Sequence, residues 1–181
     1  MLRKMAAVVG ACSLAVLAAL VGPAPARADW PALRNVWISV LPQSGPGPKV
    51  IDVTGRSTAV FAPIQLFQRQ TTNNANQYWE IIPSGVTQAD TVYKLRNRAS
   101  GLCLLRNLAG RNGDSVMLHY CSSEPFNQWR FVRVVNGNNW GLLVSLYDGR
   151  CLDVKDVTYA DAQPLQVWTC SSNWNQRWNI F

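Results

Sequence analysis

Two sets of polar and aromatic residues stand at matching places in the chain and could bind a polyhydroxylated ligand. A carboxylate accepts hydrogen bonds from hydroxyl groups, an amide donates and accepts them, and a flat aromatic ring covers an apolar C–H face. A saccharide pocket needs these groups together. The members of a set are up to 25 positions apart, so a fold must bring them together. The sets are Asp52, Gln65, Phe67, Asn76 and Gln77, and Asp153, Gln166, Trp168, Asn175 and Gln176.

Other kinds of site chemistry have less support. His119 is the single histidine, so a Ser-His-Asp or Cys-His arrangement has no convincing partner set, and we expect a packing or surface role for it. No C-x-x-C motif or histidine cluster suggests zinc, and we expect neither a metal nor a cofactor. A glycosidase needs two carboxylates on either side of one bond, which a count of the acidic residues does not exclude.

The N-terminal 28 residues have the pattern of a targeting segment. Arg3 and Lys4 precede an apolar run over residues 5–21, and small residues follow it up to Ala28. This pattern predicts a secretory signal peptide over residues 1–28, with lipid attachment at Cys12 as the alternative. No second apolar stretch of about 20 residues follows, so we expect no membrane span. We therefore predict a secreted protein.

Removal of this segment changes the charge and the cysteine count. The formal net charge falls from +7 to +4, and the remaining basic residues are scattered, so we do not expect nucleic acid as a partner. An even number of cysteines in an exported chain predicts disulfides, and four cysteines allow three pairings. The cysteines are Cys103, Cys121, Cys151 and Cys170.

A threefold internal repeat organises the rest of the chain. Trp79, Trp129 and Trp178, which are 50 and 49 positions apart, each begin a short apolar strand. The segments 50–53, 103–106 and 151–154 also match one another, as do 64–67, 116–119 and 165–168. We predict one domain over residues 35–181, with repeats at about 35–85, 90–135 and 139–181. Residues 29–34 precede it, and the Pro- and Gly-rich stretch within 42–48 is predicted to be a loop.

The repeats predict an all-β fold. Their short segments are rich in Val, Ile, Leu and aromatic residues and show no helical spacing of apolar positions. Three copies of such short strands must share one core, and closure into a barrel with three hairpins beneath it would hide the strand edges. We expect the three tryptophans in the inner layer. Turn signals separate the strands at Ser100-Gly101, Asn112-Gly113, Asn136-Gly137 and Asp148-Gly149.

The pattern C-L-D-V, then Q-x-W, then C, then N-Q-x-W resembles the ricin B-chain type of lectin domain, whose fold is the β-trefoil. The resemblance covers all three copies. It implies one disulfide within a copy, Cys103 to Cys121 and Cys151 to Cys170, whereas the first copy has Val50 and Arg69 at these places and should lack the bridge. Hydrolases that carry such modules keep their chemistry in a separate domain, so we predict a chain that is not an enzyme.

The resemblance also implies a ligand set. In this family the sugar is bound by the Asp of C-L-D-V, the Gln and aromatic residue of Q-x-W and the Asn of N-Q, and the following Gln orients the Asp. The third copy has every member, and the first has Phe67 in place of Trp. The second copy departs everywhere and should not bind; its residues at these positions are Leu105, Met117, His119, Phe126 and Asn127.

Purely structural roles are the alternative for these side chains. Asp52 and Asp153 could cap turns, and the Asn and Gln residues could tie loops to the backbone. Independent structural roles would not be expected to disappear together, yet all members are kept in two copies and lost in the second. The joint loss favours a shared binding role.

We therefore predict a secreted carbohydrate-binding lectin for galactose-type sugars or polysaccharide, with sites in the first and third repeats. The alternative is an interaction protein with a co-secreted partner, such as the cell-binding subunit of a multi-component toxin similar to cytolethal distending toxin. Such a protein would present an exposed aromatic patch, for which Trp30, Trp37 and Trp140 are the candidates.

Overall fold

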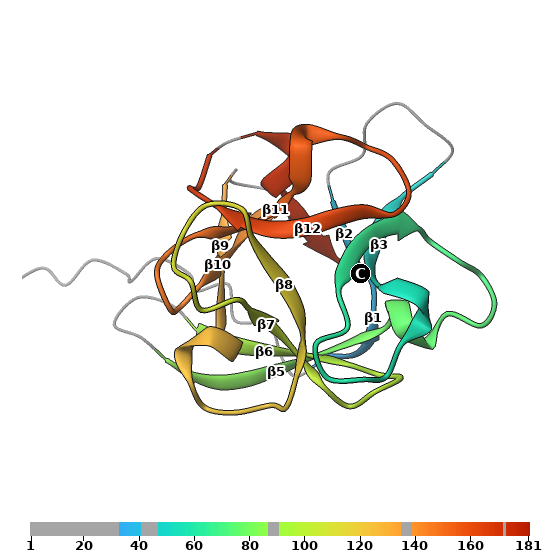
Figure 1. Ribbon diagram of the computed structural model, residues 1–181, viewed down its shortest axis with the longest axis horizontal. Helices are drawn as coiled ribbons and strands as arrows, with labels where there is room; N and C mark the ends of the chain where they lie inside the picture. Colours follow the sequence, from blue (N-terminus) through green and yellow to red (C-terminus); the bar gives the residue numbers. More distant parts are fainter. Residues whose placement is uncertain (1–32, 41–46, 87–90, 135–138, 172) are drawn as a thin grey trace, which may run out of the picture.

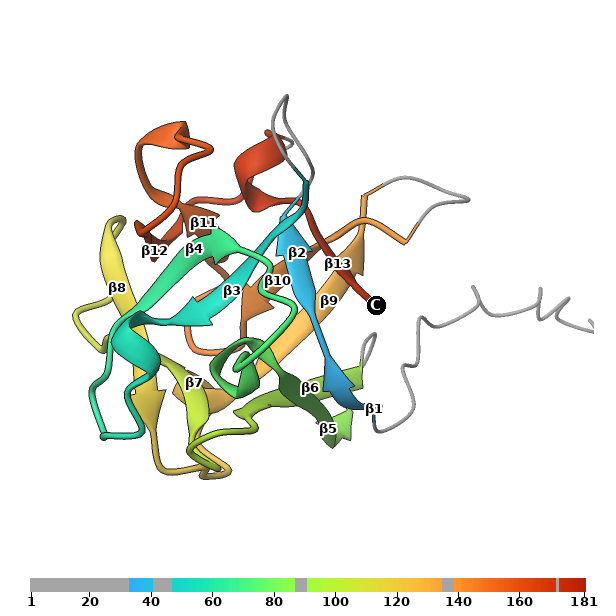
Figure 2. The same ribbon diagram turned by 90° about the vertical axis from the view of Figure 1, so that its right-hand side faces the viewer.

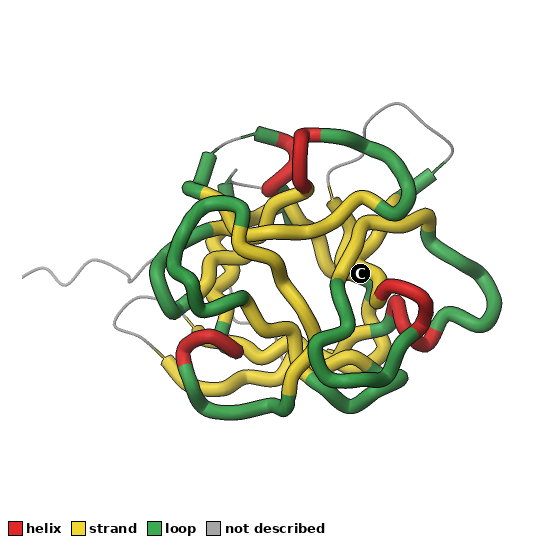
Figure 3. Tube along the Cα trace, in the orientation of Figure 1, coloured by secondary structure: helices red, strands yellow, loops and turns green. Residues whose placement is uncertain are grey.

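A computed structural model describes residues 33–40, 47–86, 91–134, 139–171 and 173–181 (Figure 1). The predicted signal peptide, Trp30, most of the Pro- and Gly-rich stretch and Asn136-Gly137 lie outside these residues. Short 3-10 turns and loops connect the strands, as Figure 3 shows. The strands are β1 (Leu33–Val36), β2 (Ile38–Val40), β3 (Lys49–Val53), β4 (Ile64–Gln68), β5 (Trp79–Val86), β6 (Thr91–Asn97), β7 (Cys103–Arg106), β8 (Asp114–His119), β9 (Trp129–Arg133), β10 (Gly141–Ser145), β11 (Cys151–Val154), β12 (Gln163–Trp168) and β13 (Trp178–Ile180).

Seven of these strands form a closed barrel. Antiparallel pairing runs from β1 to β5, then to β6, β9, β10 and β13, and returns to β2. Trp37, between β1 and β2, donates its backbone N–H to the carbonyl oxygen of Phe181 at 2.9 Å and accepts one in return at 3.1 Å. The two ends of the described chain therefore close the barrel side by side (Figure 2).

The other six strands form three hairpins that cover one end of the barrel. They are β3–β4, β7–β8 and β11–β12, and β12 also pairs with both β4 and β8. An isolated bridge between Pro63 and Met117 joins the first hairpin to the second. This arrangement confirms the predicted all-β trefoil.

The core tryptophans join the two layers. Trp79, Trp129 and Trp178 are completely buried, as predicted for the inner layer. Each indole N–H donates to a backbone carbonyl oxygen of a hairpin strand, at 3.1, 3.2 and 2.9 Å respectively. A buried indole needs a hydrogen-bond acceptor as well as apolar contact, and the same position in each hairpin supplies it. The acceptors are the carbonyl groups of Ile51, Leu104 and Leu152.

Two disulfides link the paired strands of the second and third hairpins to the chain that follows them. Cys103 bonds to Cys121 and Cys151 to Cys170, which is the pairing that the family resemblance implies. In the first hairpin, the guanidinium of Arg69 lies 5.0 Å from the centre of the Trp37 ring. At one of the two positions that carry the bridge in the other repeats, the first repeat therefore has a cation–π contact with a different part of the chain.

Removal of a disulfide is expected to destabilise the fold measurably. The bridge between Cys151 and Cys170 closes a loop of 19 positions, so replacing both cysteines with serine should lower the free energy of unfolding by about 3 kcal/mol. Urea unfolding of the oxidised proteins measures this difference. In excess dithiothreitol at a concentration that reduces both bridges, the two proteins should unfold at nearly the same midpoint, and a difference that persists there would assign the effect to packing.

Candidate functional site

The third repeat surrounds the carboxylate of Asp153 with three amide donors. Asp153 lies on β11 opposite Gln166 on β12, and its side chain is buried. Gln166 donates from Nε2 to Oδ1 at 2.8 Å, while Asn175 Nδ2 and Gln176 Nε2 donate to Oδ2 at 2.7 and 2.9 Å. The last two residues belong to the 3-10 turn Trp174–Gln176. The side chain of Trp168, at the end of β12, is 43% exposed beside this amide cage.

The first repeat builds the same amide cage around Asp52. Gln65 Nε2 donates to Oδ1 at 2.8 Å, and Asn76 Nδ2 and Gln77 Nε2 donate to Oδ2 at 2.7 and 2.9 Å. The half-buried Phe67 takes the place of the exposed tryptophan. All ten residues singled out from the sequence are thus brought together in two groups of five.

Burial shapes the acidity of both aspartates. Loss of solvent raises the pKa of Asp52 and of Asp153 above the ordinary 3.8, and the hydrogen bonds from the amide cage offset this only in part. The charges nearby act in opposite directions: Arg56 lowers the pKa of Asp52, whereas Asp156 raises that of Asp153. Each carboxylate is held by neutral amides, so its negative charge stays available to a ligand.

Both amide cages open into cavities. The first cavity has a volume of about 280 Å³ and the third one of about 460 Å³. The first is lined by Asp52, Gly55, Arg56, Gln65, Phe67, Gln70 and Asn76. The third is lined by Asp153, Asp156, Val157, Gln166, Trp168, Thr169, Cys170, Ser171, Asn173, Asn175 and Gln176.

The lip of each cavity is a strained turn that sequence analysis did not identify. Gly55 and Arg56 have φ angles of 63° and 55°, and Asp156 and Val157 have 57° and 54°. A β-branched valine in this left-handed region is unusual, and such strain persists where the surrounding structure enforces it, often at binding sites. The corresponding residues of the second repeat, 106–109, include none with positive φ.

The second repeat forms an apolar hollow instead. Leu105 faces Met117 across the hairpin, just as Asp153 faces Gln166. Asn127 Oδ1 accepts from the backbone N–H of Ser122 at 3.1 Å, as Gln176 Oε1 does from Ser171, which confirms the alignment of Asn127 with the glutamine. The cavity of about 550 Å³ is lined by Phe61, Leu105, Asn107, Leu108, Met117, His119 and Phe126.

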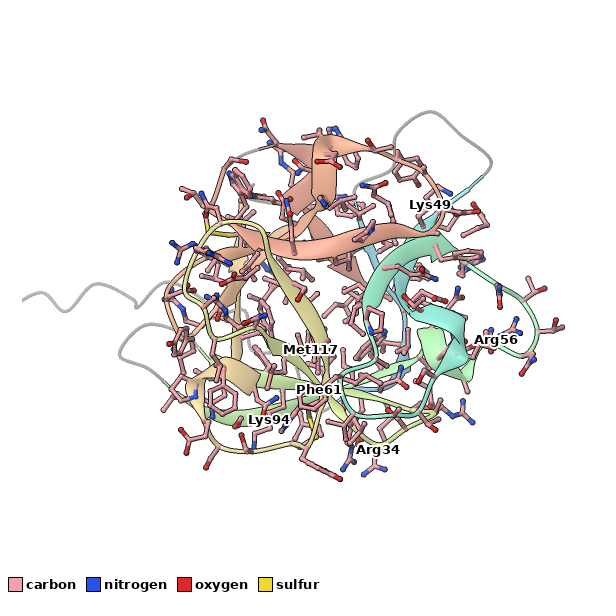
Figure 4. The ribbon with its side chains drawn as sticks, viewed as in Figure 1. Arg34, Lys49, Arg56, Phe61, Lys94 and Met117 are labelled. Carbon is pink, nitrogen blue, oxygen red and sulfur yellow. A yellow bond between two sulfur atoms is a disulfide. The ribbon has the colours of Figure 1, made fainter. Side chains whose placement is uncertain are left out.

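This hollow is the centre of an exposed apolar surface. Phe61 is 65% exposed, and its ring centre lies 5.3 Å from that of His119, which in turn lies 5.5 Å from Tyr120. Figure 4 shows Phe61 and Met117 close together there. Of the three tryptophans that the interaction-protein alternative offered for such a patch, Trp37 and Trp140 are half-buried and Trp30 lies outside the described residues. Trp37 packs against Tyr78 with ring centres 4.6 Å apart.

Each hollow is supported by a loop of a neighbouring repeat. Asn112 accepts a hydrogen bond from the backbone N–H of Thr169 at 2.8 Å, and Gly113 lies against the ring of Trp168. Asp161 accepts from the backbone N–H of Gln68 at 2.8 Å beside the first cavity. The backbone N–H of Phe61 donates to the carbonyl oxygen of Leu118 at 2.8 Å beside the apolar hollow.

The described ranges contain neither a metal-binding cluster nor a membrane-spanning helix. Within them, no three His, Cys, Asp or Glu side chains are arranged to hold a metal ion. None of the helical segments in the same ranges has the length and apolar character needed to cross a membrane.

Comparison with known proteins shows the family to which this chain belongs. A family model described as the ricin-type beta-trefoil lectin domain matches residues 43–178. ThreeFoil, a designed 3-fold symmetric protein, is 27% identical, with a TM-score of 0.68 over 80% of this chain and 96% of that protein.

Two natural proteins share the fold at lower identity. The exo-beta-1,3-galactanase 1,3Gal43A of Clostridium thermocellum is 21% identical, with a TM-score of 0.68 over 86% of this chain and 31% of the galactanase chain. A chain of cytolethal distending toxin from Actinobacillus actinomycetemcomitans is 16% identical, with a TM-score of 0.61 over 81% of this chain and 90% of the toxin chain.

Proposed function

Since the chain belongs to the ricin-type β-trefoil lectin family, whose domains bind carbohydrates, we propose that it binds glycans through the cavities of its first and third repeats. The observation that carries the proposal is the pair of matching amide cages. Each holds a buried carboxylate next to an aromatic ring and an open cavity. The second repeat keeps a cavity but has Leu105 in place of the carboxylate and Met117 in place of the glutamine that faces it.

The hydrogen bonds of the amide cage limit the number of sugar hydroxyl groups that the carboxylate can accept. A carboxylate has about four acceptor positions, and the cage fills three of them. Asp153 therefore has room for one ligand hydroxyl rather than two. The neighbouring hydroxyl would donate to Oε1 of Gln166, which lines the same cavity and accepts no hydrogen bond from the described residues.

We propose a galactose-type sugar or the end of a polysaccharide as the ligand of both sites. The similar fold found in a protein named an exo-β-1,3-galactanase supports this choice. The exposed ring of Trp168 suits a sugar with one continuous apolar face, because such a face packs on an indole without loss of hydrogen bonds. Two weak sites in one molecule would give avidity for a polymer or a glycan-coated surface.

A glycan array tests the proposal directly. The purified protein should bind galactose-terminated structures, whereas a variant in which both Asp52 and Asp153 are replaced with asparagine should bind none. A protein with both carboxylates removed that binds the same glycans would contradict the proposed sites. We also propose that the protein has no hydrolytic activity of its own, so the bound glycans should be recovered without release of reducing sugar.

We propose that the protein is exported and loses residues 1–28. The two disulfides support export, because such bonds persist in oxidising compartments. The mass of the protein recovered from the culture medium tests this, with cleavage after Ala28 as the expected result.

The saccharide affinity is expected to fall in acid. The ionised carboxylate is the acceptor, and burial raises the pKa of Asp52 and Asp153, so protonation removes the acceptor at a higher pH than for an exposed aspartate. Titration calorimetry from pH 7 downward should give an affinity that falls with a midpoint above 3.8. Circular dichroism at each pH verifies that the protein is folded. An affinity that stays constant to pH 3.8 would point to other contacts.

The apolar hollow of the second repeat favours a second function, the binding of a protein partner. Phe61 and Leu108 are more than half exposed around a cavity that would accept an aromatic or aliphatic side chain. A partner held here would bind independently of sugar and would be lost on Phe61→Ser. Capture that depends on Asp153 but not on Phe61 would instead indicate a glycan on the partner.

A further inference from the structure

The two sugar cavities carry opposite charges at their lips. Both lips are formed by the 3-10 turn that follows the strand with the buried carboxylate, η1 (Thr54–Arg56) and η4 (Lys155–Val157). Arg56 lines the first cavity, and Asp156 lines the third. The first cavity thus combines one acid with one base, whereas the residues that line the third include two acids and neither lysine nor arginine.

Hydrogen bonds hold Arg56 in place at the first cavity. Its Nη2 donates to Oε1 of Gln70 at 2.9 Å, and the backbone N–H of Gln70 donates to Oε1 of Gln77 at 2.8 Å. Gln77 is itself a member of the amide cage around Asp52. The guanidinium is therefore positioned relative to the carboxylate, and Figure 4 shows Arg56 near the outer edge of the molecule.

The guanidinium keeps most of its binding capacity. It has five N–H donors, and the hydrogen bond to Gln70 uses one of them. Within the described ranges, no carboxylate forms an ion pair with Arg56, and its side chain is exposed. A guanidinium with free adjacent N–H groups binds carboxylate or sulfate in a two-pronged geometry.

The third cavity is suited to neutral rather than anionic ligands. Asp156 stands at the place of Gly55, and Val157 at that of Arg56. The two residues of this lip that line the cavity therefore offer negative charge and no donor side chain, and Lys155 of the same turn is not part of the lining. The interaction of Asp156 with Asp153 is repulsive. An anionic ligand would meet two acids here, while a neutral sugar could donate a further hydroxyl to Asp156.

We propose that the first site accepts an acidic sugar residue, one that carries a carboxylate or a sulfate, and that the third site accepts only neutral sugar. This inference rests on the proposed carbohydrate function. Asp52 would hold ring hydroxyls, and Arg56 would pair with the acidic substituent that projects from the ring. The protein would then recognise a glycan with acidic and neutral residues at two different sites.

The test isolates each site and compares matched ligands. Asp153→Asn leaves the first site, and Asp52→Asn leaves the third; each is titrated with galactose, galacturonic acid and galactose 6-sulfate. The first site should prefer the acids by about fivefold at low salt, as expected for one exposed ion pair, and 0.5 M salt should abolish the preference. The third site should prefer galactose. Preference for one acid over the other distinguishes carboxylate from sulfate as the natural substituent.

Variants at the lips test whether Arg56 and Asp156 cause the different preferences of the two sites for acidic and neutral sugars. In the isolated first site, Arg56→Gln should bring the ratio of acidic to neutral affinity to about one, and Arg56→Gly, which suits the positive φ, guards against a local distortion. Arg111→Gln, which removes another exposed arginine outside the lining of this cavity, should preserve the ratio. In the isolated third site, Asp156→Gly should reduce the discrimination against acids.

The two possible failures differ in their outcome. If both sites bind galactose but Arg56→Gln keeps the preference for acids, the charge assignment is wrong and the carbohydrate function stands. If neither isolated site nor the wild-type protein binds any of the three sugars or a galactose-containing polymer, the proposed function is wrong.

Discussion

Replacement of Asp153 with asparagine will lower the affinity of the third site for saccharide by about tenfold to a hundredfold, because a hydrogen bond to a charged acceptor contributes about 1.5–3 kcal/mol. The amide also introduces a donor opposite Asn175 and Gln176, which now donate to the carboxylate. The amide cage would lose its order together with the ligand contact. Titration calorimetry in an Asp52→Asn background, where one site remains, measures the loss.

The second repeat provides the matched control for this substitution. Leu105 occupies the position of Asp153 in the second hairpin, opposite Met117. Leu105→Ala removes buried apolar atoms and should lower stability, but it should leave the saccharide affinity unchanged. Equal losses of affinity from the two variants would mean that the aspartate acts through the fold rather than on the sugar.

Replacement of Arg106 with alanine will destabilise the protein by about 3–5 kcal/mol, the cost of leaving buried charges without their partner. Arg106 is completely buried at the end of β7. Its Nη2 donates to Asp114 at 2.6 Å, its Nη1 pairs with Asp148, and its Nε donates to the carbonyl oxygen of Asn107 at 2.6 Å. Denaturation in urea measures the change in the free energy of unfolding.

Arg111 is the control for this experiment. It lies 3.6 Å from the same carboxylate of Asp114, but its side chain is 80% exposed. Arg111→Ala should therefore cost less than about 1 kcal/mol. If the two alanine variants are equally stable, the buried arginine does not stabilise the fold beyond a surface ion pair.

The same cluster should make the protein sensitive to acid. Burial raises the pKa of Asp148, but hydrogen bonds from Arg106 and Arg150 outweigh this and hold it below 3.8. The folded state thus favours the ionised carboxylate. Its contribution to stability is complete at neutral pH and is lost as the pH falls through the lowered pKa.

The fold could be predicted because its elements repeat, and the family resemblance supplied the residues of the two sets that form the amide cages. Three tryptophans at nearly equal spacing define the inner layer, and the paired positions of Asp153 and Gln166 follow from the register of one hairpin. The family resemblance supplied the disulfide pairing, which the cysteine count alone left open among three possibilities. Features that occur in every copy, or are lost from one copy as a group, are visible in a single sequence.

Features that occur once could not be predicted in this way. Arg106 stands where the other hairpins have a buried valine, and its partners Asp114 and Asp148 lie on different elements, so nothing in the local pattern indicated a buried ion cluster. The strained lips depend on backbone angles that the residue types disguise, since Val157 disfavours positive φ. The apolar hollow combines Phe61 from the first repeat with residues of the second, and no pattern within one repeat shows this.

The loops that support each cavity from a neighbouring repeat determine the smallest fragment of the chain that could form an ordered site. Trp168 rests on Gly113 of the preceding repeat, and the chain beside the first cavity is tied to Asp161 of the last one. A peptide that contains every residue proposed to contact sugar in the third repeat would therefore lack the neighbouring loop that lies beside its tryptophan. Truncation at a repeat boundary should remove both the proposed saccharide binding and the order of the site, so engineering of the specificity requires substitutions in the intact three-repeat domain.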